Sequence, residues 1–225
     1  MIRIAIALTA LLTFWQATAA PPTGAPPRLN ERFEQAEVSR WKAVFERPGR
    51  EVWDHRREIV DALELQPGMD VADVGAGTGF FTFLFVEAVG PAGKVYALDI
   101  SRPFVRAIAE RARREGRPNV IAVRNTDHSA LLPARSVDLV FLADTYHHFE
   151  YPRDMLASLH AALRPGGEMV VVDFRKDPHI ATPWVMRHVR AGKTQVIREI
   201  EAAGFEFTGE RNFLRTHYFL RFRKR

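Results

Sequence analysis

An acidic residue and three glycines follow one another at fixed spacing in the sequence. The segment 71–81 reads VADVGAGTGFF, and its acidic and glycine positions are Asp73, Gly75, Gly77 and Gly79. Glycine allows positive φ angles and a close approach of the backbone to a ligand. A strand that leads through such a turn into a helix presents free backbone N–H groups to that ligand. We therefore expect a ligand-binding turn here, which also includes Ala76 and Thr78.

Polar residues also stand at or just after the ends of the later apolar runs that are expected to be strands. They are, in chain order, Asp99, Asp127, His128, Asp144, His147, His148 and Asp173. In a doubly wound sheet, ligands bind outside the carboxyl ends of the strands. Several carboxylates at that edge suit a ligand with hydroxyl groups and a positive charge better than a ligand dominated by phosphate.

The elements that must position these residues alternate between strands and helices. Apolar runs predict strands at 69–74, 94–99, 119–123, 137–143 and 169–174. Helical patterns occupy 30–48, 50–63, 78–89, 103–115, 153–163 and 193–203. The last two strands, about 205–213 and 216–222, are separated by a short turn and are expected to pair antiparallel. This alternation predicts an α/β fold: a doubly wound, Rossmann-like sheet of seven strands, mostly parallel with an antiparallel last strand, and N-terminal helices.

The first residues differ in character from the rest of the chain. Arg3 is followed by an apolar run from Ile4 to Trp15 and by the small residues of Ala17–Ala19, a layout typical of a secretory signal peptide. We expect a signal peptide at 1–19, a proline-rich tether at 20–29 and one domain at 30–225, with a helical cap (30–65) and a core (66–225). The protein is then exported, to the periplasm or outside the cell. The alternative is an inner-membrane anchor with a cytoplasmic domain, although the run is shorter than the roughly 20 residues that span a bilayer.

Composition excludes several classes of function. The chain has 225 residues, a formal net charge of +5 and no cysteine, so disulfides and thiol chemistry are excluded. Basic residues gather at the C-terminus, which fits either association with a membrane surface or an ordinary solvated face; we favour the solvated face. No nucleic-acid-binding module is present. A metal-dependent reaction that uses Asp144, His147, His148 or Asp173 is an open alternative, but no specific spacing of ligand residues supports it. Nothing indicates an oligomeric state.

Three motifs in order resemble a known family. The segment from Asp73 to Gly79, then VYALDI at 95–100 and LRPGGEMVVV at 163–172, resemble class I S-adenosylmethionine-dependent methyltransferases. The resemblance extends over about 53–223 and is greatest to the small-molecule branch that contains the type 11 and quinone-biosynthesis enzymes. It implies S-adenosylmethionine as the cofactor and a small molecule as the methyl acceptor.

The resemblance also implies roles for individual residues. Gly75 to Gly79 would lie against the amino-acid end and the ribose, and Asp73 would face the amino group of the methionine part. Asp99 would accept hydrogen bonds from both ribose hydroxyls. The remaining expected contacts, around the adenine and at the end of the fourth strand, are Ile100, Thr126, Asp127, His128 and Asp144. The plainer alternatives are that the glycines only permit the turn, that Asp99 caps a helix, and that Asp127 is an exposed loop residue.

The reacting end of the site is expected at His147 and His148. A methyltransferase works mainly by proximity and orientation, and a histidine near neutral pKa can act as a base. We expect one of the two histidines to orient or deprotonate the acceptor; otherwise one caps the next helix and the other packs in the pocket wall. Trp41, Trp53 and Trp184 favour an apolar or aromatic acceptor.

Two other functions are weighed against this one. A nicotinamide-dependent oxidoreductase also has a glycine-rich turn, but its fingerprint requires glycine where this chain has Phe80. A non-catalytic S-adenosylmethionine-binding protein of the same fold would fit the contrast between an export signal and a cofactor made in the cytosol. The intact set of motifs favours an enzyme.

Overall fold

The computed structural model describes residues 29–225, so the predicted signal peptide and all but the last residue of the predicted tether lie outside the described residues. The strands, in chain order, are β1 (Val71–Val74), β2 (Val95–Asp99), β3 (Val120–Arg124), β4 (Val137–Ala143), β5 (Leu163–Phe174), β6 (Phe205–Arg211) and β7 (His217–Lys224). The helices are α1 (Glu31–Glu34), α2 (Val38–Phe45), α3 (Glu51–Asp54), α4 (Arg56–Ala62), α5 (Phe80–Val89), α6 (Arg102–Arg114), the 3₁₀ helix η1 (Tyr146–His148), α7 (Pro152–Ala162), α8 (Pro183–His188) and α9 (Lys193–Ala202).

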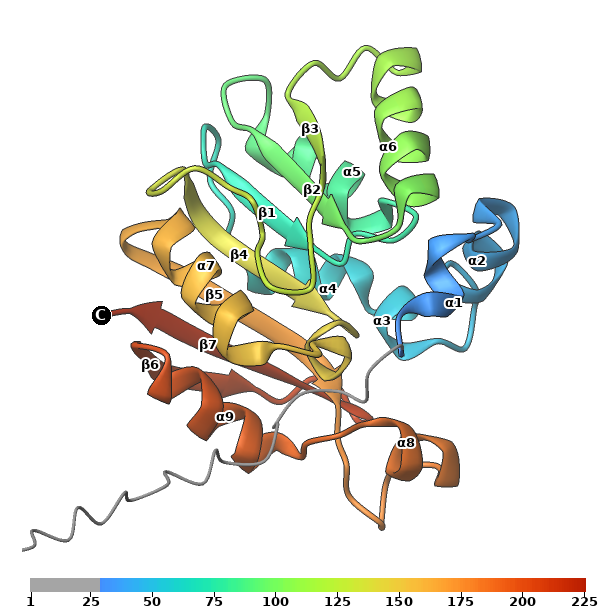
Figure 1. Ribbon diagram of the computed structural model, residues 1–225, viewed down its shortest axis with the longest axis vertical. Helices are drawn as coiled ribbons and strands as arrows, with labels where there is room; N and C mark the ends of the chain where they lie inside the picture. The colour runs from blue at the N-terminus through green and yellow to red at the C-terminus, as the bar shows by residue number, and fades with distance from the viewer. Residues whose placement is uncertain (1–28) are drawn as a thin grey trace, which may run out of the picture.

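All seven strands form one sheet in the order β3-β2-β1-β4-β5-β7-β6 (Figure 1). The strands β1 to β5 are parallel, whereas β7 is antiparallel to both β5 and β6. Val74 is level with Leu98 of β2 and with Leu142 of β4, so these three strands end at the same edge. The strand order reverses between β1 and β4, which is the place where ligands bind in open α/β sheets.

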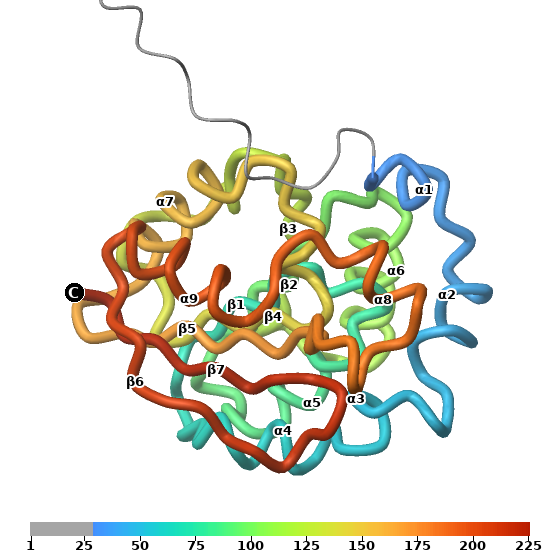
Figure 2. The backbone as a smooth tube through the Cα atoms, turned by 90° about the horizontal axis from the view of Figure 1, so that it is seen from below, coloured from blue at the N-terminus to red at the C-terminus, as the bar shows by residue number. Residues whose placement is uncertain are grey.

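Helices cover both faces of the sheet (Figure 2). One face packs its apolar side chains, such as Val140 and Leu220, against α7 and α9. The other face, including Phe141 and Val170, packs against α4 and α5. The central strands are therefore buried on both sides, which explains why they appear in the sequence as continuous apolar runs.

The predicted fold class is confirmed, and four details differ from the sequence prediction. The helix predicted at 50–63 is divided at His55 into α3 and α4. The helix predicted from residue 78 begins at Phe80, because Gly79 is left-handed (φ 78°). The turn predicted at 164–167 is a bulge inside β5, where the register with β4 shifts. The helix predicted at 30–48 is divided into the two short helices α1 and α2.

Short helices gather beyond the carboxyl ends of the parallel strands. Figure 1 places α1, α2 and α3 at that end of the sheet, and α8 approaches it from the C-terminal half of the chain. Thr182 begins α8 by accepting a hydrogen bond from the Val185 N–H at 3.3 Å. Among residues 29–225, no helix combines the length and the apolar character needed to cross a membrane.

Candidate functional site

A cavity of about 550 Å³ opens at the carboxyl ends of β1, β2, β4 and β5. Most of the residues that the sequence predicted for the site line this cavity: Asp73, Gly75, Ala76, Gly77, Thr78, Asp99, Ile100, Thr126, Asp127, Asp144, His147 and His148. Gly79 and His128 are not among the residues that line it. Residues of α1, α2, α3 and α8 form the remaining walls.

The glycine turn forms the floor of the cavity. Gly75 and Gly77 have φ angles of 72° and 54°, which L side chains rarely adopt. The N–H groups of Gly75 and Ala76 both donate to the Leu98 carbonyl at 2.8 Å, which anchors the turn to β2. A Cβ atom on Gly75 would overlap the side chain of Thr145. Glycine is therefore required at this position by both backbone conformation and space.

Asp99 ends β2 beneath the turn and is 7% exposed. Its Oδ2 accepts a hydrogen bond from the Gly77 N–H and its Oδ1 one from the Ser101 N–H, both at 2.8 Å. Burial raises the pKa of Asp99 to about 6, against the effect of these hydrogen bonds. Each carboxylate oxygen can accept a second hydrogen bond, so Asp99 can also bind a ligand with two hydroxyl groups.

Asp73 is a second buried carboxylate in the cavity wall, 3% exposed. The Thr82 hydroxyl donates to its Oδ2 at 2.6 Å. Burial, with the negative charge of Asp99 as a further cause, raises the pKa of Asp73 to about 7. A positively charged group placed beside Asp73 would favour its ionised form.

The segment after β3 supplies another part of the wall. Asn125, Ile100, Thr126 and Asp127 line the cavity, and the buried side-chain oxygen of Asn125 has no hydrogen-bond partner among residues 29–225. His128 lies elsewhere: its Nδ1 is 2.6 Å from Asp154 Oδ2 and its ring stacks on Tyr151, so the structure does not bring it into the site.

Aromatic residues of α1 and α2 cover the glycine turn. The rings of Phe33, Trp41 and Phe45 follow one another, with centroids 4.8 and 5.2 Å apart. Phe45 lies against Gly77, and the Thr78 hydroxyl donates to Glu46 Oε1 at 2.7 Å. The helical cap predicted from the sequence therefore contacts the ligand-binding turn directly.

Asp144 follows β4 with a φ of 49°, an uncommon conformation for a residue other than glycine. Its Oδ2 accepts from Arg50 Nη2 at 2.6 Å, and its Oδ1 forms an ion pair with His217 Nε2 at 3.0 Å. Although burial opposes it, the charges of His217 and Arg50 hold the pKa of Asp144 well below its usual range. Asp144 therefore joins α3, β4 and β7 at the edge of the cavity.

His217 lies between two carboxylates. Its Nδ1 is 2.8 Å from Glu51 Oε2, and Glu51 also accepts the backbone N–H groups of Arg215, Thr216 and His217. Burial lowers the pKa of His217, but the charge of Asp144 and the hydrogen bond with Glu51 outweigh that effect and raise the pKa to about 9. A doubly protonated ring then carries a positive charge that lies between both carboxylates.

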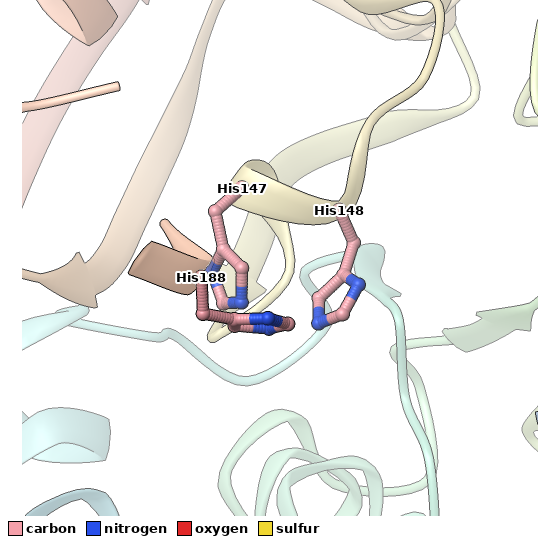
Figure 3. Close-up of side chains that lie close together, drawn as sticks. All are labelled: His147, His148 and His188. Atoms are coloured by element: carbon pink, nitrogen blue, oxygen red, sulfur yellow. The ribbon is translucent and has the colours of Figure 1, made fainter. Parts of the chain in front are cut away.

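Three histidines that line the cavity lie close together (Figure 3). His147 is 3% exposed, and its Nδ1 is 2.7 Å from Asp173 Oδ1. His148 is half-buried nearby: desolvation, followed by the proximity of His147 and Arg32, lowers its pKa to about 2. His188 of α8 completes the group, with a pKa lowered to about 4, mainly by burial.

For some residues of the site, no pattern in the sequence indicated that they belong to it. Arg50 and His217 lie outside the three motifs, and their positions follow from ion pairs between segments far apart in the chain. Asn125 could have been found, because it immediately precedes two predicted contact residues. His188 lies in the same short helix as Trp184 but far in sequence from His147 and His148, so no spacing connects the three histidines.

Comparisons with known proteins agree with this geometry. Residues 72–169 match a family model described as a methyltransferase domain. Nocamycin O-methyltransferase of Saccharothrix syringae is 31% identical over 136 residues, which cover 60% of this chain and 48% of that protein. Demethylmenaquinone methyltransferase of Anoxybacillus flavithermus is 28% identical over 118 residues, which cover 52% of this chain and 50% of that protein. The chain thus spans about half the length of these curated relatives.

Among solved structures, an S-adenosylmethionine-dependent methyltransferase from Aquifex aeolicus aligns with a TM-score of 0.74 and 26% identity, over 84% of this chain and 99% of that chain. The [4+2]-cyclase SpnF, at 19% identity and a TM-score of 0.65, shares the fold. The family match begins inside β1 and ends inside β5, so it contains the glycine turn, Asp99 and both histidines of η1. The family model, the curated relatives and the solved structures together support the resemblance to class I S-adenosylmethionine-dependent methyltransferases.

Proposed function

We propose that this protein transfers a methyl group from S-adenosylmethionine to a nucleophilic atom of a small apolar or aromatic molecule, with S-adenosylhomocysteine as the second product. The observation that carries the proposal is that one cavity has two chemically different parts. Gly75, Asp73 and Asp99 line it with polar groups at the ends of β1 and β2, whereas His147 and Trp184 line it from η1 and α8. The relatives named above act on nocamycin and demethylmenaquinone, and such molecules indicate the acceptor class.

The residues of the polar part fit S-adenosylmethionine. Asp99 has oxygen lone pairs left for the two ribose hydroxyls after its bonds to backbone N–H groups. The raised pKa of Asp73 shows a buried carboxyl that lacks a cationic neighbour, and the amino group of the cofactor would supply one. The buried, unpaired Asn125 Oδ1 offers an acceptor for an amine such as that of adenine. The cofactor, when bound, supplies an electrophilic methyl group on a positively charged sulfur.

His147 is the residue that we assign to the acceptor. Asp173 accepts from the His147 backbone N–H at 3.1 Å and lies 2.7 Å from its Nδ1, which fixes the ring. With the Nδ1 proton directed at the carboxylate, Nε2 is left as the acceptor nitrogen. Nε2 would take the proton of an acceptor hydroxyl as its oxygen bonds to the methyl carbon. His148, whose pKa is lowered to about 2, is too weak a base for that step and would orient the acceptor.

The test is an assay of S-adenosylhomocysteine release with a panel of quinols, phenols, lipids and small acids. His147→Ala and Asp173→Asn should each lower turnover at least tenfold without changing the affinity for S-adenosylhomocysteine, and His55→Ala serves as the control outside the cavity. Cofactor binding without methyl consumption on any acceptor would favour a non-catalytic binding protein instead. Equal turnover of His147→Ala and the natural protein would refute the assignment of the base.

The location of the protein remains a prediction. We propose export by the N-terminal segment 1–19, with an inner-membrane anchor as the alternative, and association of the basic C-terminus with a membrane surface as a lesser prediction. Fractionation of cells tests the location. Full-length protein in the soluble cytosol would refute both the export signal and the anchor.

A further inference from the structure

The histidines 147, 148 and 188 come from two elements that are far apart in the chain. His147 and His148 lie on η1, and His188 is the last residue of α8. One ring nitrogen from each histidine lies within 4.8 Å of those of the other two. Figure 3 shows the three rings directed toward a common space. We call this group the histidine cluster.

His147 has the surroundings of a metal-binding histidine. Its Nδ1 is 2.7 Å from Asp173 Oδ1, and Asp173 is fully buried. A carboxylate on one ring nitrogen orients the ring and increases the basicity of the other nitrogen, which is the usual outer partner of a metal ligand. Nε2 of His147 is therefore available to an ion in the cluster.

His148 gives an independent observation. Its Nδ1 is a buried atom with no hydrogen-bond partner among the described residues. Leaving such an atom without a partner costs roughly 1–3 kcal/mol. The His148 ring is held in place by an edge contact with Phe33, whose ring centroid is 5.6 Å away. Figure 3 shows the other ring nitrogen of His148, Nε2, on the side of His147 and His188, so Nε2 is the atom that an ion in the cluster would bind.

The charges near the cluster are mixed. Asp173 lies beside it, and the negative charge of Asp144 acts on His148 and would also favour a cation. The positive charge of Arg32 opposes the binding of a cation, because Arg32 Nη2 is 3.5 Å from His188 Nε2. That distance is at the limit of a hydrogen bond, and both residues belong to short helices at the mouth of the cavity. A small displacement of the Arg32 side chain would free His188 for an ion.

We propose that His147, His148 and His188 bind one divalent transition-metal ion and leave a coordination position open toward the cavity. Imidazole ligands suit zinc, copper, iron and nickel, and three histidines with an open position are a known arrangement of catalytic zinc. Zinc–nitrogen bonds of about 2.0–2.1 Å keep two ligands on one ion within about 4.2 Å of each other. The most widely separated nitrogens of the cluster must therefore approach each other slightly.

A role of such an ion in methyl transfer rests on the proposed function. The binding of the ion to the histidine cluster does not. At the open position the ion would bind an oxygen of the methyl acceptor and lower the pKa of an acceptor hydroxyl. The proton of that hydroxyl would then pass to solvent water as the oxygen bonds to the methyl carbon and the bond from methyl to sulfur breaks. His147, which is the base in the absence of an ion, would in that case hold the ion. The part of the cavity assigned to the acceptor would in that case select molecules with an oxygen that can bind a metal.

The test measures zinc binding to the untagged full chain by calorimetry, and the visible absorption of the cobalt-loaded protein. We expect about one ion per chain. His188→Ala should weaken binding at least tenfold, and His147→Ala and His148→Ala should do so as well. Asp173→Asn should weaken it about ten- to hundredfold. His55→Ala, outside the cavity, should bind zinc like the natural protein.

Calorimetry with S-adenosylhomocysteine on the same samples separates the two proposals and reports folding. His188 is less buried than His147, so His188→Ala is the variant that disturbs the fold least, and it should bind S-adenosylhomocysteine normally. Less than a tenth of an ion per chain, or an affinity that none of the three substitutions changes, would overturn the metal site. Normal binding of S-adenosylhomocysteine in that case would leave the proposed function intact.

Discussion

The affinity for the cofactor should fall as the pH is lowered, because of Asp73. This carboxyl is buried, and burial raises its pKa to about 7, with the charge of Asp99 as a further cause. In the proposed complex the ionised carboxylate faces the positively charged amino group of the cofactor. A proton on Asp73 removes that attraction, so binding weakens as the pH falls through the pKa.

The expected magnitude follows from the pKa. Below the pKa of a single group, binding that requires its ionised form weakens about tenfold per pH unit. With a pKa of about 7, lowering the pH to 5 should weaken binding about a hundredfold, or about 2.7 kcal/mol. Asp99, with a pKa of about 6, should steepen the decline at the acidic end.

The assay is calorimetric titration with S-adenosylhomocysteine between pH 5 and 8. Asp73→Asn should bind more weakly at pH 8 and lose most of the pH dependence. The Thr82 hydroxyl donates to Asp73 at 2.6 Å, and this hydrogen bond lowers the pKa of Asp73. Thr82→Val removes the bond and raises that pKa, so the decline in affinity should begin roughly one pH unit higher. Asp154→Asn is the matched control, because Asp154 pairs with His128 outside the cavity.

Two results would refute this reasoning. An affinity that stays constant from pH 8 to 5 would mean that Asp73 does not face a cationic group of the ligand. The same decline in Asp73→Asn as in the natural protein would assign the pH dependence to another group. A decline in affinity shared by the natural protein and all variants, the control included, would point to acid unfolding, which circular dichroism detects.

Three further predictions concern the cavity. Asp99→Asn should weaken S-adenosylhomocysteine binding about ten- to hundredfold in the same titration, because hydrogen bonds to a charged group contribute roughly 1.5–3 kcal/mol; an unchanged affinity would exclude Asp99 from the site. Gly75→Ala should lower the free energy of unfolding by about 1–3 kcal/mol in urea titrations, because its φ is 72° and the new Cβ would overlap Thr145; full stability would contradict the geometry. His217 is protonated in the fold with a pKa raised to about 9, so its stabilisation is complete below pH 6.5 and is lost as the pH rises through about 9. The loss should approach about 3 kcal/mol in thermal melts and be absent in His217→Gln, and an equal loss in that variant would refute the assignment.

Much of the fold could be predicted because its signals are local. The strands β1, β2 and β4 are apolar runs that end in a turn or a polar residue, and each is buried on both faces in the structure. The glycine turn was predictable for the same reason, since a conformation with positive φ needs glycine whatever surrounds it. The bulge in β5 was not predictable, because its proline and glycines also suit a turn.

The part of the site that depends on distant contacts could not be predicted. His217 has no motif around it, and its role follows from Glu51 and Asp144, which belong to other elements. His188 joins the histidine cluster only because α8, a short helix without clear periodicity, folds back over the cavity. The opposite case is His128, whose neighbours in sequence line the cavity while its own ring pairs with Asp154 and stacks on Tyr151.

The N-terminal helices connect the two parts of the cavity. Phe45 lies against Gly77 of the glycine turn, and Phe33, which follows in the same row of aromatic rings, contacts His148 of the histidine cluster. The ion pairs of Glu51 with His217 and of Arg50 with Asp144 fix the start of α3 to the sheet. The N-terminal helices α1 and α2 therefore cover both the polar part and the acceptor part of the cavity. The start of α3, which follows them, is anchored to the sheet. A ligand that orders these helices in one part also orders the wall of the other, so binding of the cofactor and binding of the acceptor should be energetically coupled.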